Sequence, residues 1–196
     1  MGSETRTRFR TSPEYIELKE EKDLFRRRLL FIGFFTTKLK EHGVNAILVG
    51  GEAIDIYTGG TFASADIDLL VENKAITEKL LNKFEFAKQG NTLWLNNELG
   101  FVVHLIQMDY SGDPDKLRKF RVKNHELRIA APEDLIKDRL CSVKFWKSNP
   151  QRDMEESVAL LKIFSDSIDN SYLDKLAKEN DIEDLLSDAR KYASTV

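Results

Sequence analysis

The sequence predicts an α/β (α+β) protein in which a short mixed sheet is packed by helices and followed by a C-terminal helical region. Short apolar runs separated by Gly and Asn pairs lie between about residues 46 and 130, which is typical of strands and turns. Helical periodicity covers residues 13–42 before them and the chain beyond Pro132 after them. Helices on both sides of mixed strands suit a sheet covered by helices, with the C-terminal helices closing one side.

The chain begins with a polar, basic and unpatterned segment over residues 1–12, where we expect a flexible tail. From Pro13, which suits the first turn of a helix, one long helical pattern runs toward His42. Gly43 is expected to end this helix. We therefore divide the chain into the tail, an α/β domain over residues 13–130, and a helical region over residues 131–196 that packs on the domain.

A strand, a short helix and a second strand come next. The apolar run at residues 46–49 is typical of a buried strand, and Gly50-Gly51 closes it. A helical pattern over residues 52–57 stops at a second Gly-Gly pair. The second strand is expected over residues 66–71 and carries Asp66 and Asp68.

The later elements are less distinctive. Asn73 can cap a helix that runs through about Lys83. We expect strands at 84–87, 92–95 and 101–108, two short strands around Arg121 and Leu127, and helices at 133–145, 152–164, 172–179 and 182–192.

Composition excludes several classes of protein. The chain has 196 residues, of which 41% are hydrophobic and 32% charged, so it is globular and not disordered. A net charge of −3 gives no global basic field for nucleic acid. The single cysteine, Cys141, excludes an internal disulfide and fits a reducing compartment. The apolar run from Leu29 to Phe35 is too short to span a membrane, so we expect a cytoplasmic protein.

Two acids and two glycines suggest a site for chemistry. Side chains on a strand alternate between faces, so Asp66 and Asp68 point the same way. Paired carboxylates offer the oxygen ligands that Mg²⁺ prefers, although they could also be the solvent face of an edge strand. The Gly50-Gly51 turn before a helix leaves free N–H groups for a phosphate, or it is an ordinary turn.

The combination Val49-Gly50-Gly51, helix, Asp66-Ile67-Asp68 resembles the nucleotidyltransferase superfamily, which has the polymerase-beta-like fold. The segment Pro132–Leu140 is similar to the helix opening of its small prokaryotic members, and the resemblance covers about residues 43–161. It implies a nucleotidyltransferase-like sheet topology and transfer of a nucleoside monophosphate from a nucleoside triphosphate to a hydroxyl acceptor. The implied metal is Mg²⁺ or Mn²⁺. The acceptor, whether a small molecule, an RNA end or a protein, and the oligomeric state are left open.

The same resemblance assigns residues to roles. Asp66 and Asp68 would be catalytic and hold the metal. Gly50, Gly51 and Ser64 would contact the phosphates. Lys137 and Arg139 could supply cations for the nucleotide, or they could form a solvated helix face.

The third acid of the superfamily pattern is where this chain departs. The corresponding strand carries His104 at its centre, and a carboxylate comes only at its end, as Asp109. His104 could be a catalytic member of the site, as a metal ligand or a base, or a hydrogen-bonded core histidine. The departure keeps a rival hypothesis open, in which the fold serves as a nucleotide-binding or partner-binding module without catalysis.

Overall fold

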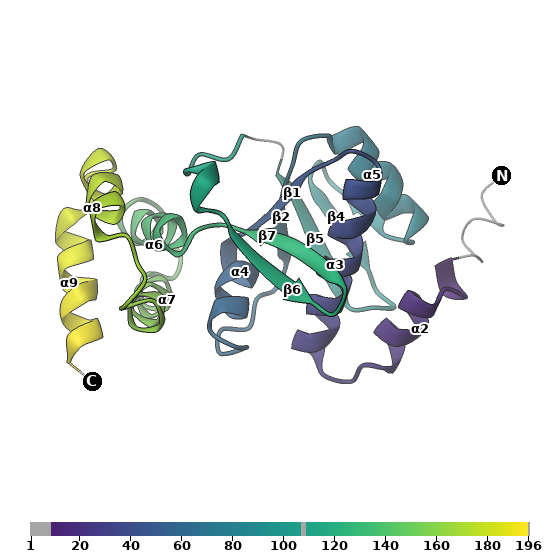
Figure 1. The fold of residues 1–196 in the computed structure, drawn as a ribbon, viewed down its shortest axis with the longest axis horizontal. Helices are drawn as coiled ribbons and strands as arrows, with labels where there is room; N and C mark the ends of the chain where they lie inside the picture. Colours follow the sequence, from purple (N-terminus) through teal and green to yellow (C-terminus); the bar gives the residue numbers. More distant parts are fainter. Residues whose placement is uncertain (1–8, 107–108, 196) are drawn as a thin grey trace.

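The computed structural model describes residues 9–106 and 109–195 and shows a seven-stranded mixed sheet with helices around it (Figure 1). The predicted fold class is confirmed. In chain order the elements are α2 (Pro13–Glu20), α3 (Leu24–Glu41), β1 (Ala46–Val49), α4 (Gly50–Tyr57), β2 (Ile67–Val71), α5 (Lys74–Lys83), β3 (Ala87–Gln89), β4 (Leu93–Asn96), β5 (Phe101–Ile106), the short η1 (Pro114–Lys116), β6 (Arg118–Val122), β7 (His125–Ile129), α6 (Pro132–Cys141), the π-helical turn η2 (Ser142–Trp146), α7 (Pro150–Ile163), α8 (Asn170–Glu179) and α9 (Glu183–Ser194).

The strand order is β3-β4-β5-β2-β1-β7-β6. The β1 strand pairs antiparallel with β2 and parallel with β7, and β2 pairs parallel with β5. These four strands form the centre of the sheet, with β4 and β3 added beyond β5 at one edge and β6 added beyond β7 at the other. Asp68 and His104 lie on the neighbouring strands β2 and β5, the Gly-Gly turn directly follows β1, and Asp66 directly precedes β2.

One face of the sheet is the core face. Side chains such as Leu48, Leu69 and Leu105 are fully buried on it. The α3 helix packs on this side, and Phe31 contacts Phe101 of β5 with ring centroids 5.1 Å apart. Side chains that point to the opposite face are only half-buried along the central strands. This opposite face is therefore accessible to a ligand.

The prediction of one long helix over residues 13–42 is wrong, because the structure has two helices there, α2 and α3. Asp23 caps α3 by accepting a hydrogen bond from the backbone N–H of Arg26 at 2.8 Å. The break lets α2 turn away and pack Tyr15 and Leu18 into the core. A capping aspartate stabilises the start of a new helix, and the spacing of the apolar residues carries no information about such a cap.

Two other expectations shift at their boundaries. The strand predicted at 84–87 is β3 at residues 87–89, because Glu85 has a φ of 62° and forms a turn after α5. Asp66 lies immediately before β2 instead of on it. Asn73 caps α5 as predicted, accepting a hydrogen bond from the N–H of Ile76.

The N-terminal segment expected to be a flexible tail has its residues 1–8 outside the described part of the chain. Phe9 is buried beside Tyr15 and Phe84, with ring centroids 5.0 and 4.6 Å away. The side chain of Arg10 pairs with Glu85 at 2.7 Å. Residues 9 and 10 thus join the packed domain.

The C-terminal helices α6–α9 gather at one end of the molecule, opposite α2 (Figure 1). The buried carboxylate of Asp134 in α6 accepts hydrogen bonds from the hydroxyls of Tyr110 and Tyr172. Tyr110 lies in the loop after β5, and Tyr172 lies in α8. Asp134 therefore ties that loop to the helical region. None of the described helices is both long and apolar enough to cross a membrane.

Candidate active site

The acids and His104 lie together on the accessible face of the sheet. Asp68 is opposite His104 in the register of β2 and β5, and Val49 is opposite Asp68 in the register of β1 and β2. One ligand atom from each of Asp66, Asp68 and His104 lies within 4.8 Å of the others. His104 Nδ1 is 2.9 Å from Asp68 Oδ1. Two carboxylates and an imidazole at this separation form a donor set that suits a divalent cation.

Gly50 is needed for this arrangement for two reasons. Its φ of 67° lies in the left-handed region, which side chains disfavour. A Cβ at Gly50 would lie 2.1 Å from Asp68 Oδ2, so the carboxylate occupies the space where a side chain would be. The glycine that ends β1 therefore admits Asp68, in addition to starting α4.

Gly51 faces a different part of the site. A Cβ built there would lie 3.0 Å from Ser64 Oγ and 3.4 Å from a terminal nitrogen of Arg139. Gly51, Ser64 and Arg139 thus converge beside the N-terminus of α4, where backbone N–H groups are free of helix partners. The free N–H groups and the Arg139 guanidinium are donors of the kind that bind a phosphate, whereas the Ser64 hydroxyl donates to the backbone carbonyl of Asp66 at 2.8 Å.

The pKa of the Asp68 carboxyl is raised by burial first and by the negative charge of Asp66 second. The hydrogen bond from His104 and the positive charge of Arg139 act in the opposite direction. Asp68 is thus a partly buried carboxylate next to a like charge. A bound cation would relieve that repulsion.

The loop before Asp66 is held from two sides, and sequence reasoning missed both residues that hold it. Arg28 of α3 donates to the backbone carbonyl of Ser64 at 3.0 Å. Arg152 of α7 donates to the carbonyl of Ala63 at 2.8 Å. Nothing in the local pattern distinguishes either arginine from a solvated helix face, because their partners are distant in sequence.

Arg28 also forms ion pairs with two buried acids on α4. Its guanidinium lies 3.0 Å from a carboxylate oxygen of Glu52 and 3.0 Å from one of Asp55. Both carboxylates are almost completely buried, and burial raises the pKa of Glu52 to about 7 despite the arginine. Arg28 therefore links the position of α4 to that of the loop carrying Ser64.

Two candidates from the sequence lie outside the cluster. Lys137 forms an ion pair with Asp138, and within residues 9–106 and 109–195 it forms no hydrogen bond or ion pair with the Gly50-Gly51 turn or the acids. It lies on the same helix as Arg139, whose side chain reaches the turn and pairs with Glu156 at 2.5 Å. Asp109 lies beyond the end of β5 and is no member of the metal-binding group found among the described residues.

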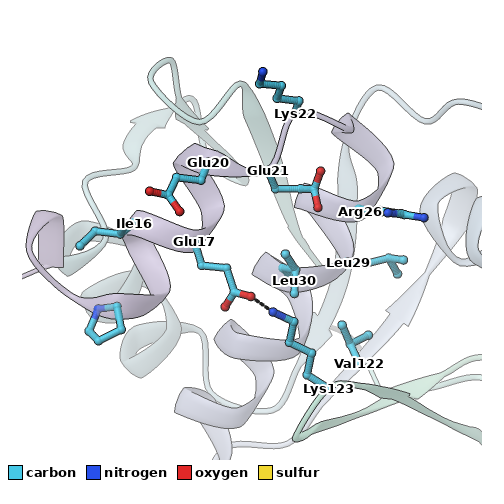
Figure 2. Close-up of a pocket in the computed structure, with 11 residues that line it drawn as sticks. Ile16, Glu17, Glu20, Glu21, Lys22, Arg26, Leu29, Leu30, Val122 and Lys123 are labelled. Atoms are coloured by element: carbon cyan, nitrogen blue, oxygen red, sulfur yellow. Dashed lines mark ion pairs between the residues drawn. The ribbon is translucent and has the colours of Figure 1, made fainter.

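A separate hollow of about 930 Å³ lies between α2, α3 and the β6–β7 hairpin (Figure 2). Leu29, Leu30 and Val122 form its apolar part, and Glu17 pairs with Lys123 across it. None of the residues of the acid cluster or the Gly-Gly turn lines this hollow. Its charges are mixed, and it has no feature that selects a ligand.

Comparison with solved structures gives three similar folds. An antigenic nucleotidyltransferase-like protein from Paracoccidioides brasiliensis superposes with a TM-score of 0.56, at 18% identity over 87% of this chain and 94% of the other. The antibiotic-resistance factor ANT(2'')-Ia superposes with a TM-score of 0.55, at 14% identity over 84% and 97% of the two chains. The same factor in complex with adenylyl-2''-tobramycin gives a TM-score of 0.51, at 15% identity and the same coverage.

The chain has a nucleotidyltransferase-like fold. The predicted resemblance is confirmed for the architecture. Identities this low are evidence for the fold alone. No protein-family model and no curated protein sequence matches the chain.

Proposed function

We propose that the protein transfers a nucleoside monophosphate from a nucleoside triphosphate to a hydroxyl acceptor, with Mg²⁺ or Mn²⁺. The observation that carries the proposal is the convergence of Asp66, Asp68 and His104 beside the Gly50-Gly51 turn. The nucleotidyltransferase-like fold supports it, and the turn and the acid cluster adjoin the neighbouring strands β1, β2 and β5.

Each group has a part in this chemistry. Asp66 and Asp68 supply oxygen ligands, and His104 supplies a nitrogen or orients Asp68. Amides at the start of α4, together with Ser64 and Arg139, bind phosphate oxygens. A bound divalent cation would neutralise charge on the phosphate and orient the attacking hydroxyl. The hydroxyl oxygen forms a bond to the α-phosphorus, the α–β anhydride bond breaks, pyrophosphate leaves with the electron pair, and the hydroxyl proton passes to solvent.

A second candidate is a nucleotide-binding module without catalysis. The specific observation in its favour is His104, which stands where a third carboxylate is expected and is a weaker ligand for Mg²⁺ than an oxygen. This candidate keeps the nucleotide and metal contacts. It differs from the first only in releasing no pyrophosphate.

Thermal unfolding with metal and nucleotide tests the site. Ligands that bind the folded protein raise its melting temperature by mass action. We expect MnCl₂ with ATP to raise it, and the double variant Asp66→Asn with Asp68→Asn to abolish the rise. Asp109→Asn is the matched control, because it removes an exposed acid that lies outside the cluster.

The outcomes separate the candidates. A melting shift that persists in the double variant overturns the metal site, and with it both candidates. A shift that disappears in the double variant but not in Asp109→Asn supports the site. A pyrophosphate-release assay with a panel of hydroxyl compounds then decides between catalysis and binding.

A further inference from the structure

The register of the sheet aligns two parallel rows of side chains on the accessible face. The first, which we call the acid row, consists of Val49, Asp68 and His104. The second, which we call the apolar row, consists of Ile47, Leu70 and Ile106 on β1, β2 and β5, and Arg128 of β7 lies at its end, beside Ile47. Successive side chains on one face are two residues apart, so the rows are about 7 Å apart. An acceptor with its hydroxyl over the acid row can rest its body on the apolar row, on the side away from the Gly50-Gly51 turn.

The apolar row forms part of a real cavity. A hollow of about 520 Å³ is lined by Ile47 and Leu70 from the row, by Arg128 at its end, and by the loop after β5. The acid cluster does not line this hollow, but the acid row is the next row of side chains on the same face. That loop contributes Tyr110, Pro114 and Leu117, so the wall opposite the sheet is mostly apolar as well. The volume suits a small organic molecule.

The loop forming the outer wall is fixed to the helical region. Tyr110 donates to Asp134, and the backbone N–H of Asp113 donates to the hydroxyl of Tyr172 at 3.0 Å. The ammonium of Lys116 pairs with Asp169 at 2.7 Å. The wall is therefore held in place independently of any ligand, as a binding site requires.

The charged groups of the hollow differ in how they are satisfied. Glu72 accepts hydrogen bonds from the backbone and side-chain nitrogens of Asn45 at 3.2 and 2.9 Å. Asp109 is exposed at the rim. Arg128 is exposed, and within residues 9–106 and 109–195 no carboxylate forms an ion pair with it. Asp109 likewise forms no ion pair with the described residues, but as a carboxylate it repels an anion. Arg128 is therefore the group of this lining that can bind an anionic ligand.

We propose that the acceptor is a small hydroxyl compound with an apolar body and an anionic group, and that Arg128 binds the anionic group. This inference rests on the proposed nucleotidyl transfer and names the acceptor class of the same site. Arg128 lies two strands away from β2, at the level of Leu70, and Asp68 is two residues from Leu70 along β2. Strand spacings of about 4.8 Å then place the hydroxyl and the anion on the order of 10 Å from each other.

Three compounds with the same apolar chain and hydroxyl test the charge. They are ω-hydroxydecanoate, decanediol and ω-aminodecanol, which end in a carboxylate, a neutral hydroxyl and an ammonium. Each is used to displace anilinonaphthalene sulfonate, a fluorescent probe with an apolar body and one anion, from the protein without nucleotide or metal. We expect the hydroxy acid to displace the probe about fivefold better than the amino alcohol, as for a partly exposed ion pair.

Charge reversal locates the effect. Arg128→Glu should invert the order of the hydroxy acid and the amino alcohol, and Arg128→Gln should equalise them. Arg26→Glu is the matched control, because Arg26 is an exposed arginine that lines the hollow of Figure 2. The proposal is overturned if wild type prefers the amino alcohol or shows no preference, if Arg128→Glu keeps the wild-type order, or if Arg26→Glu alone inverts it.

The test is separable from that of the proposed function. Probe displacement needs neither metal nor nucleotide, so a failed Mn²⁺-and-ATP melting shift leaves its result readable. Conversely, a normal melting shift with no charge preference would remove the acceptor class and leave nucleotidyl transfer standing. With wild type, transfer of label from α-labelled ATP should follow the same order of the three compounds.

Discussion

Substitution of Gly50 by Ala tests whether this glycine serves the metal site or only forms a turn. The left-handed φ of 67° costs an alanine about 1–2 kcal/mol in free energy of unfolding. The added Cβ would also lie 2.1 Å from Asp68 Oδ2, so the Asp68 carboxylate must rotate away. A displaced ligand should weaken metal binding by about 10- to 100-fold. In a chain of this size the stability loss corresponds to a melting temperature lower by about 2–8 °C.

Gly51→Ala is the matched control for this prediction. Gly51 does not have a positive φ, and its new Cβ would meet the rotatable hydroxyl of Ser64 at 3.0 Å. We expect little loss of stability and intact Mn²⁺ binding in this variant, measured by thermal melting and calorimetric titration. If Gly50→Ala binds Mn²⁺ as tightly as Gly51→Ala, Asp68 is not held where the structure places it, and the reasoning fails.

Three further predictions concern the surrounding charges. Glu52 has a pKa of about 7 in the folded protein, against 4.5 for an ordinary glutamate, so the folded protein binds this proton more tightly than the unfolded chain does. The free energy of unfolding should therefore fall as pH rises from about 4.5 to 7. Urea titrations at several pH values should show a smaller fall in the Glu52→Gln variant. Arg28→Met leaves two buried carboxylates unpaired and should lower the free energy of unfolding by about 3–5 kcal/mol, and adding Glu52→Gln should restore part of that loss. If the single variant Arg28→Met and the double variant Arg28→Met with Glu52→Gln are equally stable, the pairing is contradicted. His104→Glu should lower the melting temperature without metal, because it adds a charge opposite Asp68, and Mg²⁺ should restore it. A variant that Mg²⁺ fails to stabilise would assign His104 a structural role.

Local sequence predicted which strands carry Asp68 and His104. Alternation along a strand is a short-range property, so Asp68 and His104 could be assigned to faces before their strands were paired. Gly50-Gly51 could be located because a turn needs glycine whatever surrounds it. The helix cap at Asn73 is likewise a contact between near neighbours, and it was found where the sequence placed it.

Long-range pairing decided the rest. The sequence could not distinguish Arg28 and Arg152 from solvated arginines, because their partners Ser64 and Ala63 lie 36 and 89 positions away, respectively. It could not choose between Lys137 and Arg139, which share a helix but point to different neighbours. The row from Arg128 to Ile106 exists only because β7, β1, β2 and β5 pair in that register. Residue types and local backbone preferences are written in the chain, whereas the identity of a side chain's partners is set by strand order and helix packing.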